Sequence, residues 1–320
     1  MSFDKLEQSF QDMWIVRSMI PRKGTDMLND SKSNIKKPRI AIAGATGRVG
    51  ATLTALLAAD PIDLVALTRQ PSAARLPEGV AGFKVDFKRA DTLEEALRGT
   101  DRLFIAHGTS IEQVANEIAL IDAAIASGVR HIVKLSALGP ATRLLPIAWH
   151  MQIEAHLAQQ PIASTVLRPT TFTDVLKRAG AHIAGGSWAG AAGNGRVNFI
   201  DIRDVAEVAR IALLEEIEPT SQRAYHLSGP RAWTMIQVAE ELTRLLGHPV
   251  SYVDRTPAEQ SEALLDAGLS AFVADLLVGL DQMFRESTIA ETTSTVEELT
   301  GKAPRSLTEW LTDNLNAFRA

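Results

Sequence analysis

Short apolar runs alternate with helix-periodic segments from about residue 38 onward. The runs have the length and β-branched composition of buried strands, and the segments between them place apolar residues at the 3.6-residue spacing of helices. Strands that alternate with helices in this way favour a parallel sheet covered on both faces. We predict strands at 39–43, 62–67, 83–87, 102–106, 131–135 and 162–167, and helices ending near 60 and spanning 92–98, 111–127 and 147–159.

After Pro169 this alternation loosens. The pattern predicts helices at 173–184, 205–214 and 235–246, strands at 197–200, 224–227 and 250–253, a glycine-rich stretch at 185–195, and further helices after Pro257. The fold class is therefore α/β, a Rossmann-type doubly wound parallel sheet with a smaller C-terminal α/β substrate lobe. We assign 38–168 to the NAD(P)-binding Rossmann domain and 169–320 mainly to the lobe, with segments that return to the Rossmann domain.

Residues 1–37 read as an N-terminal extension. Apolar residues from Phe3 to Val16 recur near helical spacing, and a polar, lysine-bearing run at 29–37 follows. One interpretation is a surface helix or a partly disordered segment. The other is an arm that packs on a partner subunit or covers the pocket.

Composition narrows the function classes. The 320 residues carry a net charge of −5, which argues against a nucleic-acid surface, and no apolar run is long enough to span a bilayer. The absence of cysteine excludes disulfides, thiolate nucleophiles and sulfur-ligated metals. We expect a cytoplasmic protein whose partner is a small molecule, neither nucleic acid nor membrane, and for which a homodimer is one compatible assembly.

Three glycines lie between the first predicted strand and the following helix. In Gly44-x-x-Gly47-x-x-Gly50, the first glycine permits the tight turn, the second lets the backbone approach a pyrophosphate, and the third allows close helix packing. The helix N-terminus offers free N–H groups to the anion. The turn predicts dinucleotide binding, with Thr46, Arg48 and Val49 as further contacts.

The end of the second strand indicates which dinucleotide binds. An acidic residue there would hold a free ribose 2′-hydroxyl, but the chain has Arg69 instead. A guanidinium matches the oxygens of a 2′-phosphate, which favours NADPH (NADP+) over NADH. Asp86 and Phe87, at the end of the third strand, are placed against the adenine.

At this point the sequence resembles the NmrA-like atypical short-chain dehydrogenases/reductases. This family includes NAD(P)H:quinone oxidoreductases, triphenylmethane reductases and NADPH-sensing regulators. The resemblance covers about residues 38–255 and rests on Ala43-Gly44-Ala45-Thr46-Gly47-Arg48-Val49-Gly50, Thr68-Arg69, Val85-Asp86-Phe87, His131-Ile132-Val133-Lys134-Leu135-Ser136, Leu167-Arg168-Pro169, Phe199-Ile200-Asp201-Ile202-Arg203-Asp204-Val205-Ala206 and Tyr225-His226-Leu227-Ser228-Gly229-Pro230.

The resemblance implies where the nicotinamide lies, near the C-terminal ends of the fourth to sixth strands. It implies that His107, Gly108 and Thr109 flank the nicotinamide ribose, and that Lys134 and Ser136 face the ring or the substrate. Pro169-Thr170-Thr171-Phe172 would form a wall of the pocket. Open parallel sheets bind ligands at this same edge.

A catalytic Tyr-x-x-x-Lys pair is missing. The chain has only two tyrosines, Tyr225 and Tyr252, and neither has a lysine four residues later. The expected position holds His150 and Glu154, one helical turn apart, so Glu154 could orient or charge the imidazole. The alternative is a surface ion pair. We predict His150, Ser136 and Lys134 as the catalytic residues.

Without that pair, acceptors that take hydride with little acid assistance are favoured. We predict an NADPH-dependent oxidoreductase that reduces a conjugated acceptor such as a quinone, enone or dye. The alternative is an NADP(H)-binding redox sensor of the NmrA type with no turnover. Asp204, near the start of the predicted helix 205–214, reads as an N-terminal cap rather than a catalytic acid.

Overall fold

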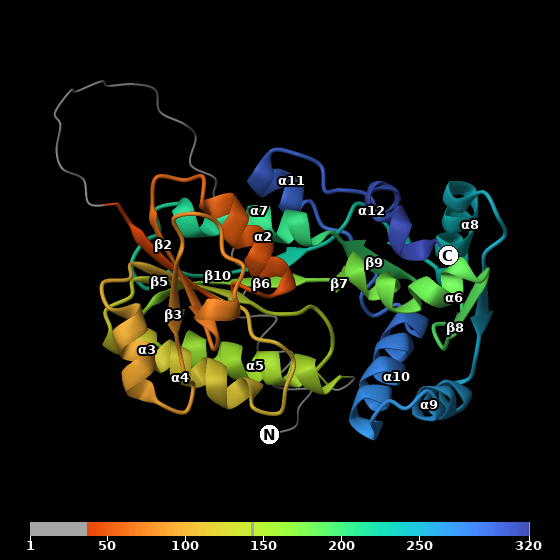
Figure 1. Cartoon of the computed structure of the whole chain (residues 1–320), viewed down its shortest axis with the longest axis horizontal. Coiled ribbons are helices and arrows are strands. Elements are labelled where there is room, and N and C mark those ends of the chain that lie inside the picture. The colour runs from red at the N-terminus through yellow and green to blue at the C-terminus, as the bar shows by residue number, and fades with distance from the viewer. Residues whose placement is uncertain (1–36, 142–143, 320) are drawn as a thin grey trace.

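The computed structural model describes residues 37–141 and 144–319. Its centre is a seven-stranded parallel sheet in the order β10-β6-β5-β4-β1-β2-β3, which confirms the predicted α/β fold class (Figure 1). The strands are β1 (Arg39–Ala43), β2 (Asp63–Thr68), β3 (Ala81–Lys84), β4 (Arg102–Ile105), β5 (His131–Leu135), β6 (Ala163–Pro169) and β10 (Gln222–Leu227).

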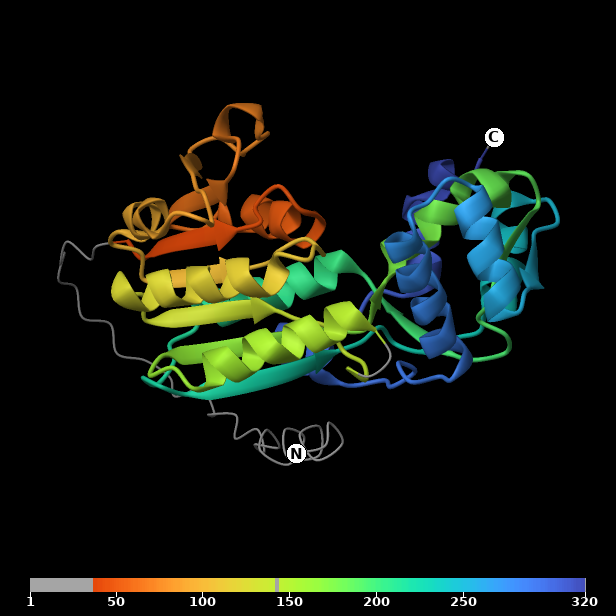
Figure 2. The ribbon, with the colours of Figure 1, turned by 90° about the horizontal axis from the view of Figure 1, so that it is seen from below.

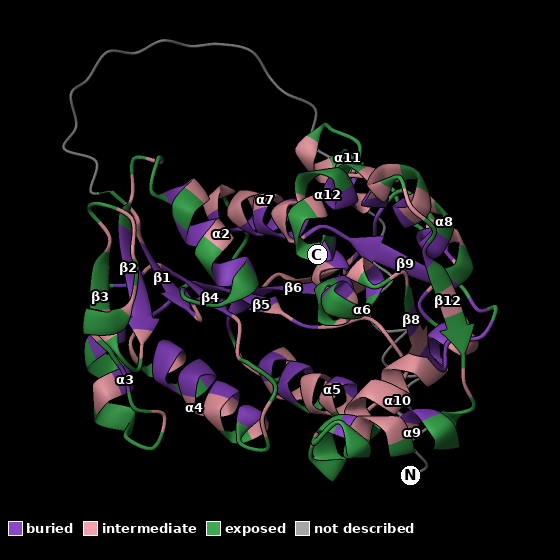
Figure 3. Ribbon diagram, turned by 45° about the vertical axis from the view of Figure 1, so that its right-hand side comes forward, coloured by how far each residue is buried: buried purple, intermediate pink, exposed green. Residues whose placement is uncertain are grey.

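Helices cover both faces of this sheet, so its central strands are buried on both sides (Figure 3). Along β1, Ile40 and Ile42 pack into one hydrophobic cluster, whereas Ala41 and Ala43 pack into the other. This double burial explains why the strands read as continuous apolar runs. One face carries α2 (Arg48–Leu57), α7 (Ile202–Leu214) and α11 (Thr295–Thr300), and the other carries α3 (Ala90–Leu97), α4 (Gln113–Ala126) and α5 (Leu145–Ala158).

A smaller unit, called the lobe below, lies beyond the carboxyl ends of the strands (Figure 2). Its core contains several aromatic side chains, among them Trp188, Phe199, Trp233 and Trp310. It comprises β7 (Thr171–Phe172), the 3₁₀ helix η2 (Thr173–Ala179), α6 (Gly180–Ala184), β8 (Ser187–Gly190), β9 (Val197–Ile200), β11 (Ala232–Trp233), α8 (Met235–Leu246), β12 (Ser251–Asp254), α9 (Pro257–Asp266), α10 (Ala271–Arg285), α12 (Leu307–Asp313) and the 3₁₀ helix η3 (Leu315–Phe318).

Three predicted elements differ from the structure. The third strand spans Ala81–Lys84, not 83–87, so Asp86 and Phe87 follow the strand instead of ending it. Its bounds were missed because this edge strand is mostly exposed and lacks the apolar alternation that marks a strand. The helix predicted over 173–184 is divided into η2 and α6 at Gly180, where a Cβ would lie 2.3 Å from the Ala317 carbonyl oxygen. The glycine-rich stretch contains the unpredicted strand β8, and a short 3₁₀ helix, η1 (Pro71–Ala73), follows β2.

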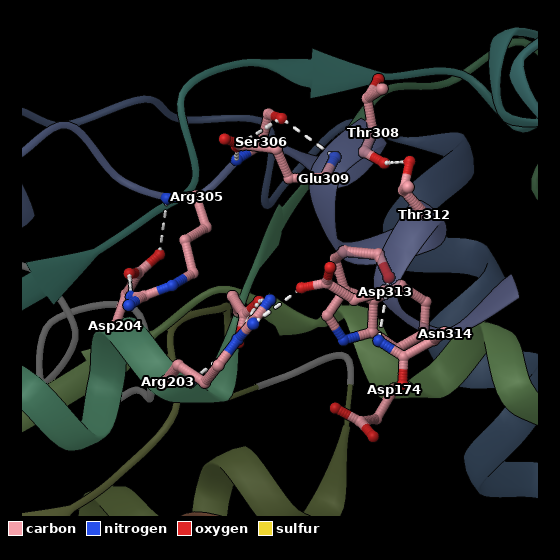
Figure 4. A network of polar contacts seen from close by, with 12 residues as sticks. Asp174, Arg203, Asp204, Arg305, Ser306, Thr308, Glu309, Thr312, Asp313 and Asn314 are labelled. Atoms are coloured by element: carbon pink, nitrogen blue, oxygen red, sulfur yellow. Dashed lines mark hydrogen bonds and ion pairs between the residues drawn. The ribbon is translucent and has the colours of Figure 1, made fainter.

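The N-terminus of α7 corrects the capping prediction. The cap is Asp201, whose carboxylate accepts a hydrogen bond from the Arg203 backbone N–H at 2.8 Å. Asp204 is buried and instead accepts from the Arg305 backbone N–H at 2.8 Å and pairs with its guanidinium (Figure 4). Asp204 therefore ties α7 to the segment that leads into α12.

The predicted N-terminal helix and most of its linker lie outside the described residues. Within residues 37–141 and 144–319, no helix has the length and apolar character needed to cross a bilayer.

Candidate functional site

The glycine turn joins β1 to α2. A Cβ on Gly44 would lie 2.0 Å from the Ala106 carbonyl oxygen, and one on Gly50 would lie 2.1 Å from the Gly44 carbonyl oxygen. Both positions therefore require glycine for backbone packing. Gly47 differs, because it is exposed and its nearest contact would be at 3.2 Å.

The first turn of α2 is open to an anion. Gly47 is the N-cap residue and provides no side-chain hydrogen bond, so the N-terminal N–H groups of the helix stay available. Thr46, Gly47 and Arg48 are exposed, whereas Val49 is buried in the core. A bare helix N-terminus with room for close backbone approach fits the pyrophosphate of a dinucleotide.

Two predicted arginines lie around this turn. The Arg48 guanidinium lies over the Phe172 ring, 5.6 Å from its centroid, so the first residues of the lobe contact the glycine turn. Arg69 is exposed, directly after β2. In the part of the chain that the structure describes, Arg69 has no carboxylate partner, which leaves its guanidinium available for a phosphate.

The segments that follow β3 and β4 bring two predicted residues together. The Phe87 and His107 rings meet edge to face, with centroids 5.4 Å apart. His107 Nε2 lies 3.1 Å from Asn116 Nδ2 of α4, which fixes the ring orientation. Asp86 is exposed and accepts from the Lys88 backbone N–H, and Gly108 and Thr109 are exposed beyond β4.

A buried ion pair lies under His150. Lys134 Nζ is 2.8 Å from Glu117 Oε2, and both side chains are at most 1% exposed. The same Nζ contacts the Leu135 carbonyl oxygen and lies 3.0 Å from His150 Nδ1. Gln113, also buried, donates to Glu117 Oε1 at 3.0 Å. Lys134 thus lies in the interior, surrounded by protein acceptors.

This ion pair determines the state of His150. Burial, and then the positive charge of Lys134, hold the pKa of His150 well below 6.5, so its imidazole is neutral at pH 7. Because an ammonium group can only donate, His150 Nδ1 accepts and the ring hydrogen resides on Nε2.

Ser136 and Glu154 form a second network, which corrects one expectation. Glu154 does not orient His150. Its carboxylate accepts from the Ser136 hydroxyl and from Arg168 Nε at 3.1 Å. The guanidinium on β6 directs Glu154 away from His150, although the two residues are one turn apart on α5. Ser136 is buried in this network.

The predicted pocket wall follows β6. Pro169 is buried, and its carbonyl oxygen accepts from the Leu138 backbone N–H at 2.9 Å, which joins the segments after β5 and β6. Thr170 is buried, and Thr171 and Phe172 pair with β9 to begin the lobe. This segment therefore connects the two parts of the chain at the carboxyl edge of the sheet.

Both tyrosines lie elsewhere. Tyr225 is on β10, paired in register with Leu167. Tyr252 is on β12 in the lobe, where its hydroxyl accepts from the Ala192 backbone N–H at 2.9 Å and its ring packs on Trp188. Neither stands beside Lys134.

The site also contains three residues that the sequence did not single out: Glu117, Gln113 and Arg168. Residues 113, 117, 120 and 124 share the buried face of α4 at helical spacing. A glutamine and a glutamate at such core-facing positions indicate a buried polar site, because a buried charge requires a partner. Arg168 gave no such signal, since its place between apolar Leu167 and Pro169 hides its orientation.

The chain is similar to known NAD(P)H-binding proteins. A family model described as NAD(P)H-binding matches residues 44–216. The chain is 30% identical over 286 residues to an NAD(P)H azoreductase of Xenophilus azovorans, covering 88% of this chain and 99% of that protein. It is 31% identical over 277 residues to quinone oxidoreductase 2 of Escherichia coli (strain K12), covering 84% of this chain and 96% of that protein.

Solved structures agree. The NADPH-dependent quinone oxidoreductase of Escherichia coli complexed with NADPH superimposes with a TM-score of 0.79 at 27% identity, over 87% of this chain and 100% of that one. The triphenylmethane reductase of Citrobacter sp. has the same fold, with a TM-score of 0.78 at 23% identity over 87% of this chain and 99% of that one. The chain belongs to the NAD(P)H-binding family, within the NmrA-like atypical short-chain dehydrogenases/reductases.

Proposed function

We propose that this protein is an NADPH-dependent reductase that transfers hydride to a conjugated acceptor such as a quinone or an azo or triphenylmethane dye. The proposal is supported by the azoreductase and the quinone oxidoreductase, which match nearly the full length of the described fold. The single observation that carries it is the buried Lys134–Glu117 pair beneath a neutral His150, in a chain whose two tyrosines lie elsewhere.

The proposed cofactor contacts follow the carboxyl edge of the sheet. The turn from Gly44 to Gly50, with Thr46, Arg48 and Val49, holds the pyrophosphate, and Arg69 holds the 2′-phosphate. Bound NADPH supplies the hydride. The ends of the central strands then line the remainder of the cofactor. Asp86 and Phe87 lie toward the adenine, and His107, Gly108, Thr109 and Pro169 toward the nicotinamide half.

In this proposal, His150 donates a hydrogen bond from Nε2–H to the acceptor atom on which negative charge develops. A neutral imidazole is too weak an acid to release this proton, so the proton that completes the reduction comes from solvent. The delocalised anion of a conjugated acceptor needs only this hydrogen bond, whereas the localised alkoxide from an isolated ketone would need protonation by a stronger acid.

Lys134 and Ser136 act as positioning residues. Lys134 fixes the tautomer and orientation of His150, because its Nζ is surrounded by Leu135, Glu117 and His150. Ser136, through Glu154 and Arg168, fastens the end of β5 to β6. The two networks hold the edge rigid where acceptor and nicotinamide must meet.

The test is NADPH oxidation by the purified protein across a panel of benzoquinones, naphthoquinones, azo dyes and triphenylmethane dyes, with simple ketones as the control class. We expect acceptor-dependent loss of absorbance at the nicotinamide band with conjugated acceptors and none with ketones. Tight NADPH binding without oxidation by any acceptor would contradict the proposal and favour a cofactor sensor.

A further inference from the structure

The lobe contains a cavity of about 270 Å³ that is partly open to solvent. Its sides come from η2 and α6, from the paired strands β8 and β12, and from α9 and α10, which lie together in the lobe (Figure 3). The buried side chains of Leu176, Trp188, Met235 and Phe284 contribute an apolar, partly aromatic wall. This volume is just below the usual range for ligand pockets and suits a small molecule of one or two rings.

Polar groups with excess positive charge line the same cavity. The guanidinium groups of Arg178 and Arg255 lie on it, against the single carboxylate of Asp281, and His182 also lines it. The Asp281 carboxylate also accepts from the Ala191 backbone N–H at 2.8 Å. Arg178 has no carboxylate within ion-pair distance in the described part of the chain, and partial burial together with the positive charge of Arg48 at the glycine turn lowers its pKa. An anionic ligand would supply the missing negative charge.

Helix α10 separates this cavity from the carboxyl edge of the sheet. Leu277, Leu280 and Asp281 line the cavity. Elsewhere on the helix, the Phe272 ring stacks on Trp149 of α5 at 6.3 Å between centroids. Met283 contacts the segment after β5, since a Cβ on Gly139 would lie 2.7 Å from its Cε. The cavity and the site around His150 thus lie on different sides of one helix.

We propose that the lobe cavity is a second small-molecule site, which binds a planar aromatic anion of one or two rings. The ring packs against Trp188 and Phe284, and the anionic group faces Arg178 and Arg255. The site is distinct from the acceptor site, and its occupation requires no turnover.

The experiment is calorimetric titration of 2-naphthoate into the NADPH-saturated full chain. Ala263 lines the cavity from α9, whereas Ala258 is exposed on the same helix and does not line it. We expect one bound 2-naphthoate per chain, at least tenfold weaker binding in Ala263→Phe, and less than twofold change in Ala258→Phe. The NADPH affinity of both variants should equal that of the parent protein.

Charge recognition gives an independent readout that does not depend on filling the cavity. Arg178→Gln, a change at an exposed position, should weaken 2-naphthoate about tenfold, and the uncharged 2-naphthamide should bind weakly to parent and variant alike. Unchanged affinity in both Ala263→Phe and Arg178→Gln would overturn the proposal. Strict displacement of 2-naphthoate by a quinone acceptor would also overturn it, because the cavity would then be the acceptor site. Failure of the hydride-transfer proposal alone would leave these binding results standing.

Discussion

At the residue scale, the proposed catalytic site depends on a buried ion pair. Lys134 and Glu117 are fully buried, and Lys134 also contacts His150. Lys134, Ser136 and His150 were predicted from the sequence as site residues, but their division of roles was not. That division depends on Glu117 and Arg168, which come from other elements and whose contacts no local spacing encodes.

Breaking this pair should be costly. Lys134→Met leaves the Glu117 carboxylate buried without its counter-ion, so we expect the free energy of unfolding to fall by about 3–5 kcal/mol. The double variant Lys134→Met/Glu117→Gln removes both charges and should recover part of that loss. Urea unfolding of the two single variants and the double variant measures the coupling. Additive losses would show that the two charges do not interact.

Cofactor choice is also decided by one side chain. Arg69→Ala should weaken NADPH binding by about 1–3 kcal/mol, through loss of a charged contact with the 2′-phosphate, and leave NADH binding nearly unchanged. Fluorescence titration with both cofactors checks this. The neighbouring exposed Gln70→Ala is the matched control. Equal weakening of NADPH and NADH in Arg69→Ala would contradict the assignment.

His131 makes stability depend on pH. Burial, Arg102 and Arg223 lower its pKa from 6.5 to about 3. At pH values between these two pKa values, His131 binds a proton in the unfolded chain but not in the folded chain. The free energy of unfolding therefore has its full value above pH 6.5 and falls as the pH decreases below it. The loss from this group is at most about 1.4 kcal/mol per pH unit.

Urea unfolding between pH 7.5 and 5 measures this dependence. In His131→Gln, the free energy of unfolding should change less with pH than in the parent protein, by the contribution of one proton. In His182→Gln, at an exposed position, the pH dependence should be unchanged. A variant curve parallel to that of the parent protein would count against a neutral, buried His131.

At the element scale, the glycine turn shows what the sequence can reveal. The three-residue spacing predicted the strand-to-helix turn, because only glycine tolerates backbone contacts as close as those at Gly44 and Gly50. The start of β3 was not predictable, because an exposed edge strand has no apolar periodicity. The division of the predicted helix at Gly180 was not predictable either, because it coincides with a contact to Ala317, far away in the sequence.

Two alanine substitutions in this turn should therefore differ. Gly50→Ala forces a Cβ to within 2.1 Å of the Gly44 carbonyl oxygen, and we expect a stability loss of about 1–3 kcal/mol. Gly47→Ala meets its nearest atom at 3.2 Å, so it should retain most of the stability and instead weaken NADPH binding. Thermal unfolding and cofactor titration of both variants separate these effects. The reverse pattern would contradict the assigned roles.

At the scale of the whole molecule, the sheet and the presence of a lobe were predictable, but the contacts that assemble the lobe were not. The central parallel strands are buried on both faces and therefore appear in the sequence as short apolar runs, which can be recognised from neighbouring residues alone. The lobe depends on contacts between residues far apart in the chain, such as Asp204 with Arg305 and Tyr252 with Ala192. The return of α7, β10 and α11 to the sheet makes the two parts interdependent. The carboxyl edge of the sheet, where they meet, is the proposed place of reaction.

The most direct test of hydride transfer is a single turnover of NADPH bound to the protein. The protein in excess over NADPH is mixed rapidly with a naphthoquinone, and the nicotinamide absorbance is followed. We predict one exponential loss whose rate rises and saturates with quinone concentration and falls at least tenfold in His150→Phe. Bound NADPH that stays reduced at saturating quinone would contradict the account.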